Sequence, residues 1–385
     1  MQTIKADLPD ADYLIKTDSY VKNLGNRLLS IDFLRGFIMV LLALESTQLY
    51  TNLINTSTNR PVNSILNQFF HHPWHGLHFW DLVQPIFMFV AGSATAFSLE
   101  KQQEIMTWNQ SFAKILKRCG WLFFWGVTDY LVREHGLSFE LWDVLTQLAF
   151  TTLIAFLISR SSSTLQITVS LLFLLIPELL YRFIQIPGFD QPFTNQHNFG
   201  NYMDLVLMNK TNPDGWVAIN CLSTSAHTIW GLMAGQLLLS NQTGKAKAIK
   251  LCTAGLLLLV LGFGMDLTGI TPIIKKIATS SFVLASGGFC LLFLAACYWY
   301  IDIKNNRKNL LFFTIVGMNS IFIYLFFEIV GERWFNGYIN AIAGGLMKLI
   351  HLPQTVILII SSCCIFFLEW GICYFLYKKK VFFRI

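Results

Sequence analysis

The sequence predicts an all-α, polytopic membrane protein with about ten transmembrane helices, and three observations support this fold class. Hydrophobic residues make up 54% of the 385 residues and charged residues only 13%, whereas soluble domains carry about a quarter. The apolar residues gather in runs long enough to cross a hydrocarbon core of about 30 Å, which takes ~20 helical residues. Lys and Arg residues favour alternate ends of these runs. This composition excludes an ordinary soluble protein.

Ten segments have the length and apolar content of a transmembrane helix. In chain order they are 32–53, 78–99, 111–132, 140–159, 164–186, 216–239, 247–268, 280–302, 310–331 and 354–377. One further segment, 333–352, contains Arg333, Lys348 and two glycines, which favours a surface-lying or re-entrant segment over a spanning helix. We therefore expect a single transmembrane domain, 32–377, between cytoplasmic tails at 1–31 and 378–385.

The distribution of basic residues predicts the orientation of these helices. With a cytoplasmic N-terminus, nineteen Lys and Arg residues fall on the inner side, and Arg35 at the inner end of the first span is left uncounted. The eight on the outer side are Arg60, Arg133, Arg182, Lys210, Lys275, Lys276, Arg333 and Lys348. This bias agrees with the positive-inside rule. Both termini are expected in the cytoplasm, and the polar first thirty residues show no cleaved signal peptide.

Polar side chains gather in the outer half of the expected bundle. Glu45 lies about 20 Å along the first span from Asp32, at 1.5 Å per helical residue, and Asp81 and Gln84 begin the second span. Others stand at the outer ends of later spans: Asp129, Asp143, Gln147, Asn220 and Glu328. Ionisable groups within a membrane mark a functional site unless they cap helices or pair at the interface. The pattern therefore predicts a polar funnel that opens to the outside.

Four of the eight histidines fall within residues 71–78, directly before the second span, and three interpretations stay open. His71, His75 and His78 would share one helix face, as a zinc site requires, but a proline and a glycine interrupt that helix. The eight cysteines lie in apolar segments without CxxC spacing and indicate no metal or redox site. In the second interpretation the histidines form an interfacial loop of the aromatic belt.

In the third interpretation the cluster is catalytic. An imidazole, whose ordinary pKa is about 6.5, can take a proton from an attacking amine or hydroxyl. A neighbouring carboxylate, Asp81 or Glu45, would orient His71 and raise its pKa by stabilising the charged form. Trp74 would offer an apolar face to a sugar ring.

Three motifs near the N-terminus, taken together, are similar to those of a known family. They are RLLSIDFLRG (Arg27–Gly36), H-x-x-W-x-G (His71–Gly76) and D-L-x-x-P-x-F-x-F-x-x-G (Asp81–Gly92). NPDGWVAIN (Asn212–Asn220), HTIWGLMAG (His227–Gly235) and GMNSIFIY (Gly317–Tyr324) follow in the places of similar elements. Over about residues 27–330 the chain resembles the transmembrane heparan-alpha-glucosaminide N-acetyltransferase family and its bacterial relatives.

The resemblance implies transfer of an acetyl group from cytosolic acetyl-CoA to an amino sugar, such as a glucosamine-type glycan, on the extracytoplasmic side. It places the active-site histidine at His71. No metal cofactor is expected. Ser46 stands where lysosomal members have an asparagine. The compact N-terminal region is similar to that of the bacterial members, which implies the bacterial inner membrane as the location.

Each role in this reaction falls on particular residues. His71 is expected to be the base or a transient acyl carrier, with Glu45 and Asp81 as its partners. The residues expected to contact the acceptor or line a route through the bundle are Trp74, Ser46, Gln84, Asn220, His227 and Asn319. The residues expected to bind CoA are Arg35, Lys117, Arg118 and Lys245, although the positive-inside rule explains these cations equally well.

Two other functions stay open at this point. A proton-coupled transporter of sugars or glycan precursors would also use buried carboxylates and histidines, and a zinc-dependent membrane hydrolase would need a metal. The expected partners are acetyl-CoA, a glycan acceptor and the lipid bilayer. A homodimer stays open, and no nucleic acid partner is expected.

Overall fold

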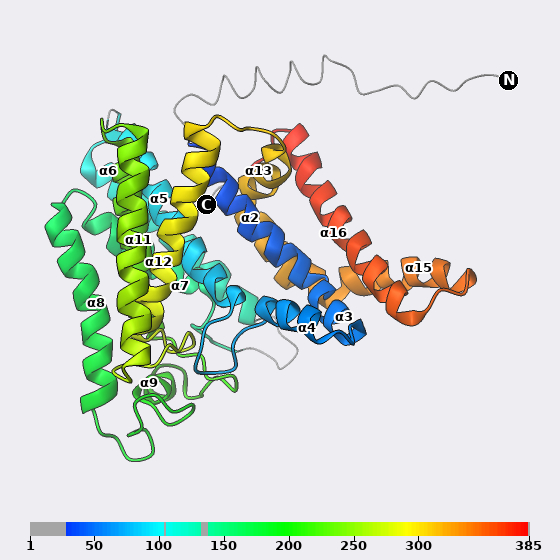
Figure 1. The fold of residues 1–385 in the computed structure, drawn as a ribbon, viewed down its shortest axis with the longest axis horizontal. Helices are drawn as coiled ribbons and strands as arrows, with labels where there is room; N and C mark the ends of the chain where they lie inside the picture. Colours follow the sequence, from blue (N-terminus) through cyan, green and yellow to red (C-terminus); the bar gives the residue numbers. More distant parts are fainter. Residues whose placement is uncertain (1–27, 104, 132–137, 384–385) are drawn as a thin grey trace.

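The computed structural model describes residues 28–103, 105–131 and 138–383, which form a bundle of helices (Figure 1). Within these ranges there is no strand, and the only β-type pairing is an isolated bridge between His75 and Ile274. Most of the predicted N-terminal tail, the last two residues of the C-terminal tail, and Arg133 lie outside the described residues. An all-helical, polytopic architecture agrees with the fold class expected from the sequence.

Fifteen α-helices are described, and each predicted span corresponds to one or two of them. They are α2 (Leu29–Ser46), α3 (Leu49–Thr56), α4 (Arg60–Leu66), α5 (Val83–Gln103), α6 (Trp108–Leu131), α7 (Val144–Leu157), α8 (Ser163–Phe183), α9 (Phe199–Met208), α10 (Asn220–Leu239), α11 (Gly244–Leu267), α12 (Ser280–Cys297), α13 (Leu310–Met318), α14 (Ser320–Phe326), α15 (Asn336–Leu349) and α16 (Gln354–Lys378). Short 3-10 turns occupy Asn67–Phe69 and Phe79–Leu82, and π-helical turns occupy Tyr298–Ile303 and Phe327–Phe335.

The described residues contain five helical segments long and apolar enough to cross a membrane, or six if α13 and the bent helix after it count as one span. The five are Phe79–Gln102, α8, α11, Ser280–Ile303 and α16. The predicted count of about ten is therefore not confirmed. α2 carries three charged side chains, α6 carries four, and α7 has only 14 residues. The charged side chains of α2 and α6 and the short length of α7 keep these three helices out of that set, although α7 is itself apolar.

Two predicted spans are interrupted. The first ends as a helix at Ser46, because Gln48 adopts a left-handed conformation with φ of 62° before α3 begins. The ninth bends by 75° at Asn319, between α13 and α14. The buried Asn319 side chain donates to the carbonyl of Val381 and accepts from the amide of Phe383, so the C-terminal segment satisfies polar groups at the break.

Segment 333–352 continues this bent helix through a π-helical turn into α15. Most residues of α15 are exposed. Its helical content excludes an irregular surface loop. The bend that precedes it is compatible with either a broken span or a re-entrant element.

The core of the bundle is built around α2, α5, α10 and α12, with α8 and α11 at one side and α16 at the other (Figure 1). α5 and α10 approach each other most closely at Gly92 and Gly231. A Cβ atom at Gly92 would collide with the carbonyl oxygen of Thr228, and one at Gly231 with that of Phe89. Small residues permit this close approach of two membrane helices.

The two ends of the bundle differ in structure. At one end α2 begins and α16 ends (Figure 1). At the opposite end lie α4, α9 and two loops, 70–78 and 268–279. The bridge between His75 and Ile274 and the hydrogen bond from the Gly76 amide to the Ile273 carbonyl, at 2.9 Å, hold these two loops together.

Candidate functional site

The carboxylate of Asp81 organises the histidine-rich loop. It accepts hydrogen bonds from the backbone amides of His78 at 2.8 Å and His72 at 3.3 Å, both through Oδ2. Its second oxygen, Oδ1, lies 3.0 Å from Nδ1 of His71. Asp81 is completely buried, and the burial of a carboxylate requires such partners. One side chain therefore shapes the loop and orients the His71 ring.

Lys275 comes from the second loop and completes a three-residue cluster. Its ammonium lies 3.1 Å from Nδ1 of His71 and 3.7 Å from Oδ1 of Asp81. It also stands over the ring of Trp216, 5.3 Å from the centroid. The pairing of the two loops brings this lysine to the histidine, although 204 positions separate them in the sequence.

The protonation of His71 follows from these neighbours. Burial among its neighbours and the positive charge of Lys275 lower the pKa of His71 to about 4, although Asp81 opposes this shift. The predicted rise in pKa is therefore wrong, because burial and the unpredicted lysine together outweigh Asp81. Burial also lowers the pKa of Lys275 to about 8, against the attraction of Asp81 and Glu45. His71 is thus neutral at physiological pH.

A neutral His71 carries one ring proton, so Nδ1 either donates to Asp81 or accepts from Lys275. The charge-assisted bond to a buried carboxylate favours the first arrangement, and Lys275 still keeps Asp81 as its ion-pair partner. Nε2 then has a free lone pair, and among the described residues none bonds to it. This arrangement gives His71 the properties of a general base.

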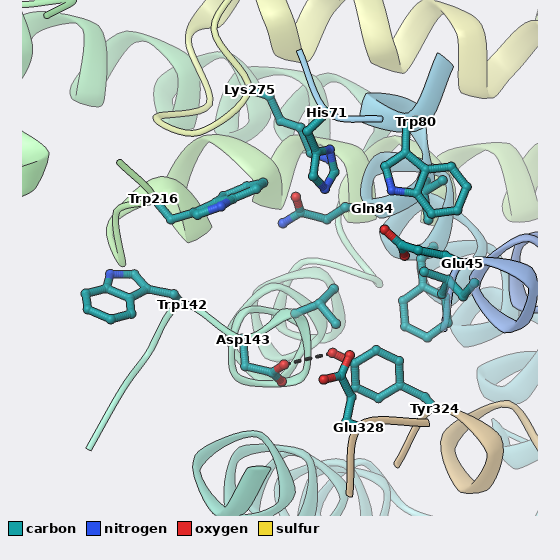
Figure 2. A pocket seen from close by; sticks show the side chains of 14 residues that line it. Glu45, His71, Trp80, Gln84, Trp142, Asp143, Trp216, Lys275, Tyr324 and Glu328 are labelled. Atoms are coloured by element: carbon teal, nitrogen blue, oxygen red, sulfur yellow. Dashed lines mark hydrogen bonds between the residues drawn. The ribbon is translucent and has the colours of Figure 1, made fainter. Parts of the chain in front are cut away.

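His71 lines a pocket with a volume of about 260 Å³, and Figure 2 shows its ring directed into that pocket beside Gln84. The lining residues come from α2, the start of the second predicted span, α7, α14, the π-helical turn Phe327–Phe335 and the loops at this end of the bundle. They are Leu42, Glu45, His71, Trp80, Val83, Gln84, Phe87, Trp142, Asp143, Val144, Trp216, Lys275, Tyr324 and Glu328. Three indoles and three carboxylates therefore surround the histidine.

The aromatic walls are fixed by hydrogen bonds behind them. Asp204 of α9 accepts from Nε1 of Trp142 at 3.1 Å and from the backbone amide of Ala218 at 2.8 Å, two residues after Trp216. Burial raises the pKa of Asp204 to about 7, and these two bonds oppose the rise. The Trp216 ring meets the His71 ring edge-on, with the ring centroids 5.6 Å apart. α9 thereby positions two walls of the pocket.

The lower side of the pocket, as drawn in Figure 2, is polar. The hydroxyl of Tyr324 donates to Asp143 at 2.8 Å, and the carboxylates of Glu45 and Glu328 face the same space. Gln84 donates from Nε2 to Gln147 at 2.6 Å, which leaves its carbonyl oxygen for a ligand. Indole faces with nearby acceptors suit a sugar ring that carries an amino group.

The structure brings together four of the residues predicted at the site: Glu45, His71 and Gln84 line the pocket, and Asp81 holds the histidine. Trp74 lies outside the pocket, where its Nε1 donates to the carbonyl of Phe193 at 2.8 Å. The Ser46 hydroxyl is also turned away and donates to the carbonyl of Ala43 at 2.9 Å. The three indoles that line the pocket belong to Trp80, Trp142 and Trp216.

Three further predicted residues are buried elsewhere in the bundle. Asn220 donates to the carbonyl of Lys276 at 3.4 Å, and its own side-chain oxygen has no protein partner. His227 lies 2.8 Å from the hydroxyl of Ser286 through Nε2, which is a helix contact between α10 and α12. Asn319 holds the C-terminal segment, as described above. None of the three lines the pocket that contains His71.

A second pocket, of about 270 Å³, lies at the other end of α2 and α5. Arg35 and Lys101 line it, and Arg35 is paired with Asp32. The Nε atoms of Arg35 and Arg118 are buried without a hydrogen-bond partner, and the two guanidinium groups repel each other electrostatically. An anion bound between the two arginines would accept hydrogen bonds from their Nε atoms and would offset the repulsion between their charges. Arg118 itself does not line this pocket, and Lys117 and Lys245 are exposed and also lie outside it.

The histidines do not gather around a common point. Nε2 of His75 lies 2.7 Å from Asp266, and Nδ1 of His78 lies 2.9 Å from the carbonyl of Phe70. Within the described ranges no group of three or more His, Cys, Asp or Glu residues is placed to hold a metal ion. The geometry of these histidines is therefore that of a hydrogen-bonded loop.

Sequence reasoning missed Lys275, Trp142 and Trp216 as members of the site. Lys275 was counted among the basic residues of the outer side, and Trp216 belongs to the NPDGWVAIN motif. An aromatic residue at the edge of a loop predicted to lie outside the membrane was the available signal. No protein-family model matches this chain, and no curated protein matches it.

Proposed function

We propose that this chain is a membrane-embedded N-acetyltransferase that moves an acetyl group from acetyl-CoA to an amino sugar across the membrane. The observation that carries the proposal is the His71 imidazole, which Asp81 holds through Nδ1 while Nε2 faces a pocket of indoles and carboxylates. The sequence resemblance supports the same reaction. The inner membrane of a bacterium is the proposed location.

In this reaction His71 takes the proton that the acceptor nitrogen loses as it attacks the thioester carbonyl. The C–S bond then breaks, and the proton returns to the departing sulfur, so CoA leaves as a thiol. Lys275 is the only cation that lines the pocket among the described residues. Its ammonium would stabilise the negative charge that develops on the carbonyl oxygen.

The second pocket supports entry of the acyl donor from the opposite end. Arg35 and Glu45 lie on α2, ten residues apart, which corresponds to about 15 Å along a helix. A donor with a long flexible arm can place its phosphates near Arg35 and Arg118 and extend its thioester toward His71. The unpaired Nε atoms of these arginines favour such an anion.

A proton-coupled sugar transporter is the second candidate, and the bent helix favours it. Transporters often place discontinuous helices near their substrate site, and α13 and α14 meet at an angle of 75°. The break lies at Asn319, which is bound to the C-terminal segment.

The two functions are separated by an assay with purified protein in liposomes, radiolabelled acetyl-CoA and a panel of amino sugars, beginning with glucosamine. The enzyme forms N-acetylated sugar without an ion gradient. A transporter accumulates labelled sugar inside the vesicles in response to a proton gradient and leaves acetyl-CoA intact. Uptake without any N-acetylated product would overturn the proposal.

A further inference from the structure

A large groove lies between α8 and α11, on the side of the bundle away from α16 (Figure 1). Its volume of about 670 Å³ exceeds that of either pocket described above. α8 packs on α10 and α11 packs on α12, so these two pairs form its walls and floor. Both α8 and α11 are long and apolar enough to cross a membrane, so a groove between them would meet the hydrocarbon of the bilayer.

The groove has a polar end and an apolar end. Ser163 at the start of α8, Ser240 and Gln242 after α10, and Lys250 in the second turn of α11 line one end. Toward the other end the lining turns to leucines, among them Leu261. This gradient matches an amphiphile with a polar head and a hydrocarbon chain.

The length of the groove fits one leaflet. On α11, Lys250, Ala254, Leu257 and Leu261 are spaced four, three and four residues apart, so they share one helix face. The eleven residues from Lys250 to Leu261 correspond to about 17 Å. Half of a hydrocarbon core of about 30 Å is about 15 Å.

The deep part of the groove offers no competing polar partner. Nε1 of Trp230 donates to the hydroxyl of Ser170 at 3.0 Å, so these two polar groups satisfy each other. At the polar end, the ammonium of Lys250 is exposed and forms no hydrogen bond or ion pair within the part of the chain that the structure describes. A phosphate at this position would pair with it.

We propose that the groove binds one phospholipid with an anionic headgroup, from the leaflet at the end where α8 and α11 begin. The headgroup phosphate contacts Lys250, and an acyl chain lies along Ala254, Leu257 and Leu261. A basic residue near an anionic membrane surface contributes about 1 kcal/mol, which is a factor of about five in affinity. This lipid site stands independently of the acetyltransferase proposal.

Native mass spectrometry of the purified full chain tests the site after exchange into mixed micelles of phosphatidylglycerol and phosphatidylcholine. We expect the wild type to retain one phosphatidylglycerol, and Lys250→Gln to retain it about five-fold less. Lys245→Gln removes an exposed lysine of the same helix outside the groove and should leave retention unchanged.

A second pair of variants tests the acyl chain. Ala254→Trp fills the groove and should abolish retention of the lipid, whereas Leu256→Trp on the exposed, opposite face of α11 should not. Size-exclusion profiles confirm that each variant folds. Equal retention in the wild type, Lys250→Gln and Ala254→Trp would overturn the proposal. A dimer without lipid, which Ala254→Trp dissociates, would assign the groove to a second copy and overturn it as well.

Discussion

Nδ1 of His71 lies 3.0 Å from Oδ1 of Asp81, which joins a half-exposed ring to a completely buried carboxylate. The carboxylate also fixes the backbone of the loop that follows the histidine, through the amides of His72 and His78. The ring therefore has one orientation and one favoured tautomer. The proposed chemistry depends on this relationship, because only that tautomer leaves Nε2 as a base.

Asp81→Asn tests the orientation of the ring. The amide cannot hold the imidazole through a charge-assisted bond, so the tautomer with a free Nε2 is no longer favoured. We expect kcat to fall by about 100-fold, at the lower end of the range for general acid–base catalysis. The measurement is the initial rate of acetyl transfer per folded molecule, with folding followed by thermal unfolding. A variant that folds and retains wild-type kcat would contradict the role of Asp81.

Lys275→Met tests the electrostatics of the site through pH. Without the lysine, Asp81 still stabilises the imidazolium, so the pKa of His71 rises from about 4 toward its ordinary value, although burial still lowers it. The base works only when neutral, and it is lost as pH falls below its pKa. Lys275→Met should therefore lose activity between pH 7 and pH 5, where the wild-type imidazole stays neutral.

The readout is the ratio of the variant's kcat to the wild-type kcat at each pH, because the titration of the amine acceptor cancels in this ratio. We expect the ratio to fall as pH decreases from about 7 to about 5. A constant ratio over this range would show that Lys275 does not control the protonation of His71.

The sequence predicted the helices and the centre of the site better than it predicted their arrangement. Apolar runs placed the helices to within a few residues, and the H-x-x-W-x-G motif pointed to the loop that carries His71. The meeting of His71 with Lys275 depends on a tertiary contact between two loops, which no local pattern encodes. Both α2 and α6 were predicted as spans although they carry charged side chains. α2 is largely buried in the bundle, whereas α6 has an exposed side. α9 lay in a segment without an apolar run, so its helical structure and the role of Asp204 were missed.

Trp216→Leu tests the aromatic wall. Loss of the indole face should raise KM for the amino sugar by about 5–30-fold, the factor that corresponds to one or two kcal/mol, with a smaller change in kcat. Trp74→Leu is the matched variant, since Trp74 lies outside the pocket. The measurement is the acceptor dependence of the rate at saturating acetyl-CoA. A larger effect from Trp74→Leu would place the sugar elsewhere.

Arg118→Gln tests the donor end. Its buried, unpaired Nε atom is expected to bind a phosphate of the donor, and a hydrogen bond to a charged group contributes about 1.5–3 kcal/mol. We expect KM for acetyl-CoA to rise by about ten-fold while KM for the sugar stays unchanged. Lys117→Gln changes the exposed neighbour and should have no effect. Equal KM values for acetyl-CoA in both variants and the wild type would place the donor in another pocket.

The most direct test of the central claim compares His71→Ala with His72→Ala in the acetyl transfer assay. The two histidines are adjacent in one loop, but only His71 lines the pocket and contacts Asp81 through its side chain. The proposed mechanism predicts that His71→Ala loses acetyl transfer by a factor of about 10²–10⁴, with expression and folding retained, while His72→Ala stays within a few-fold of the wild type. Wild-type turnover by a folded His71→Ala variant would contradict the assignment of His71 as the base.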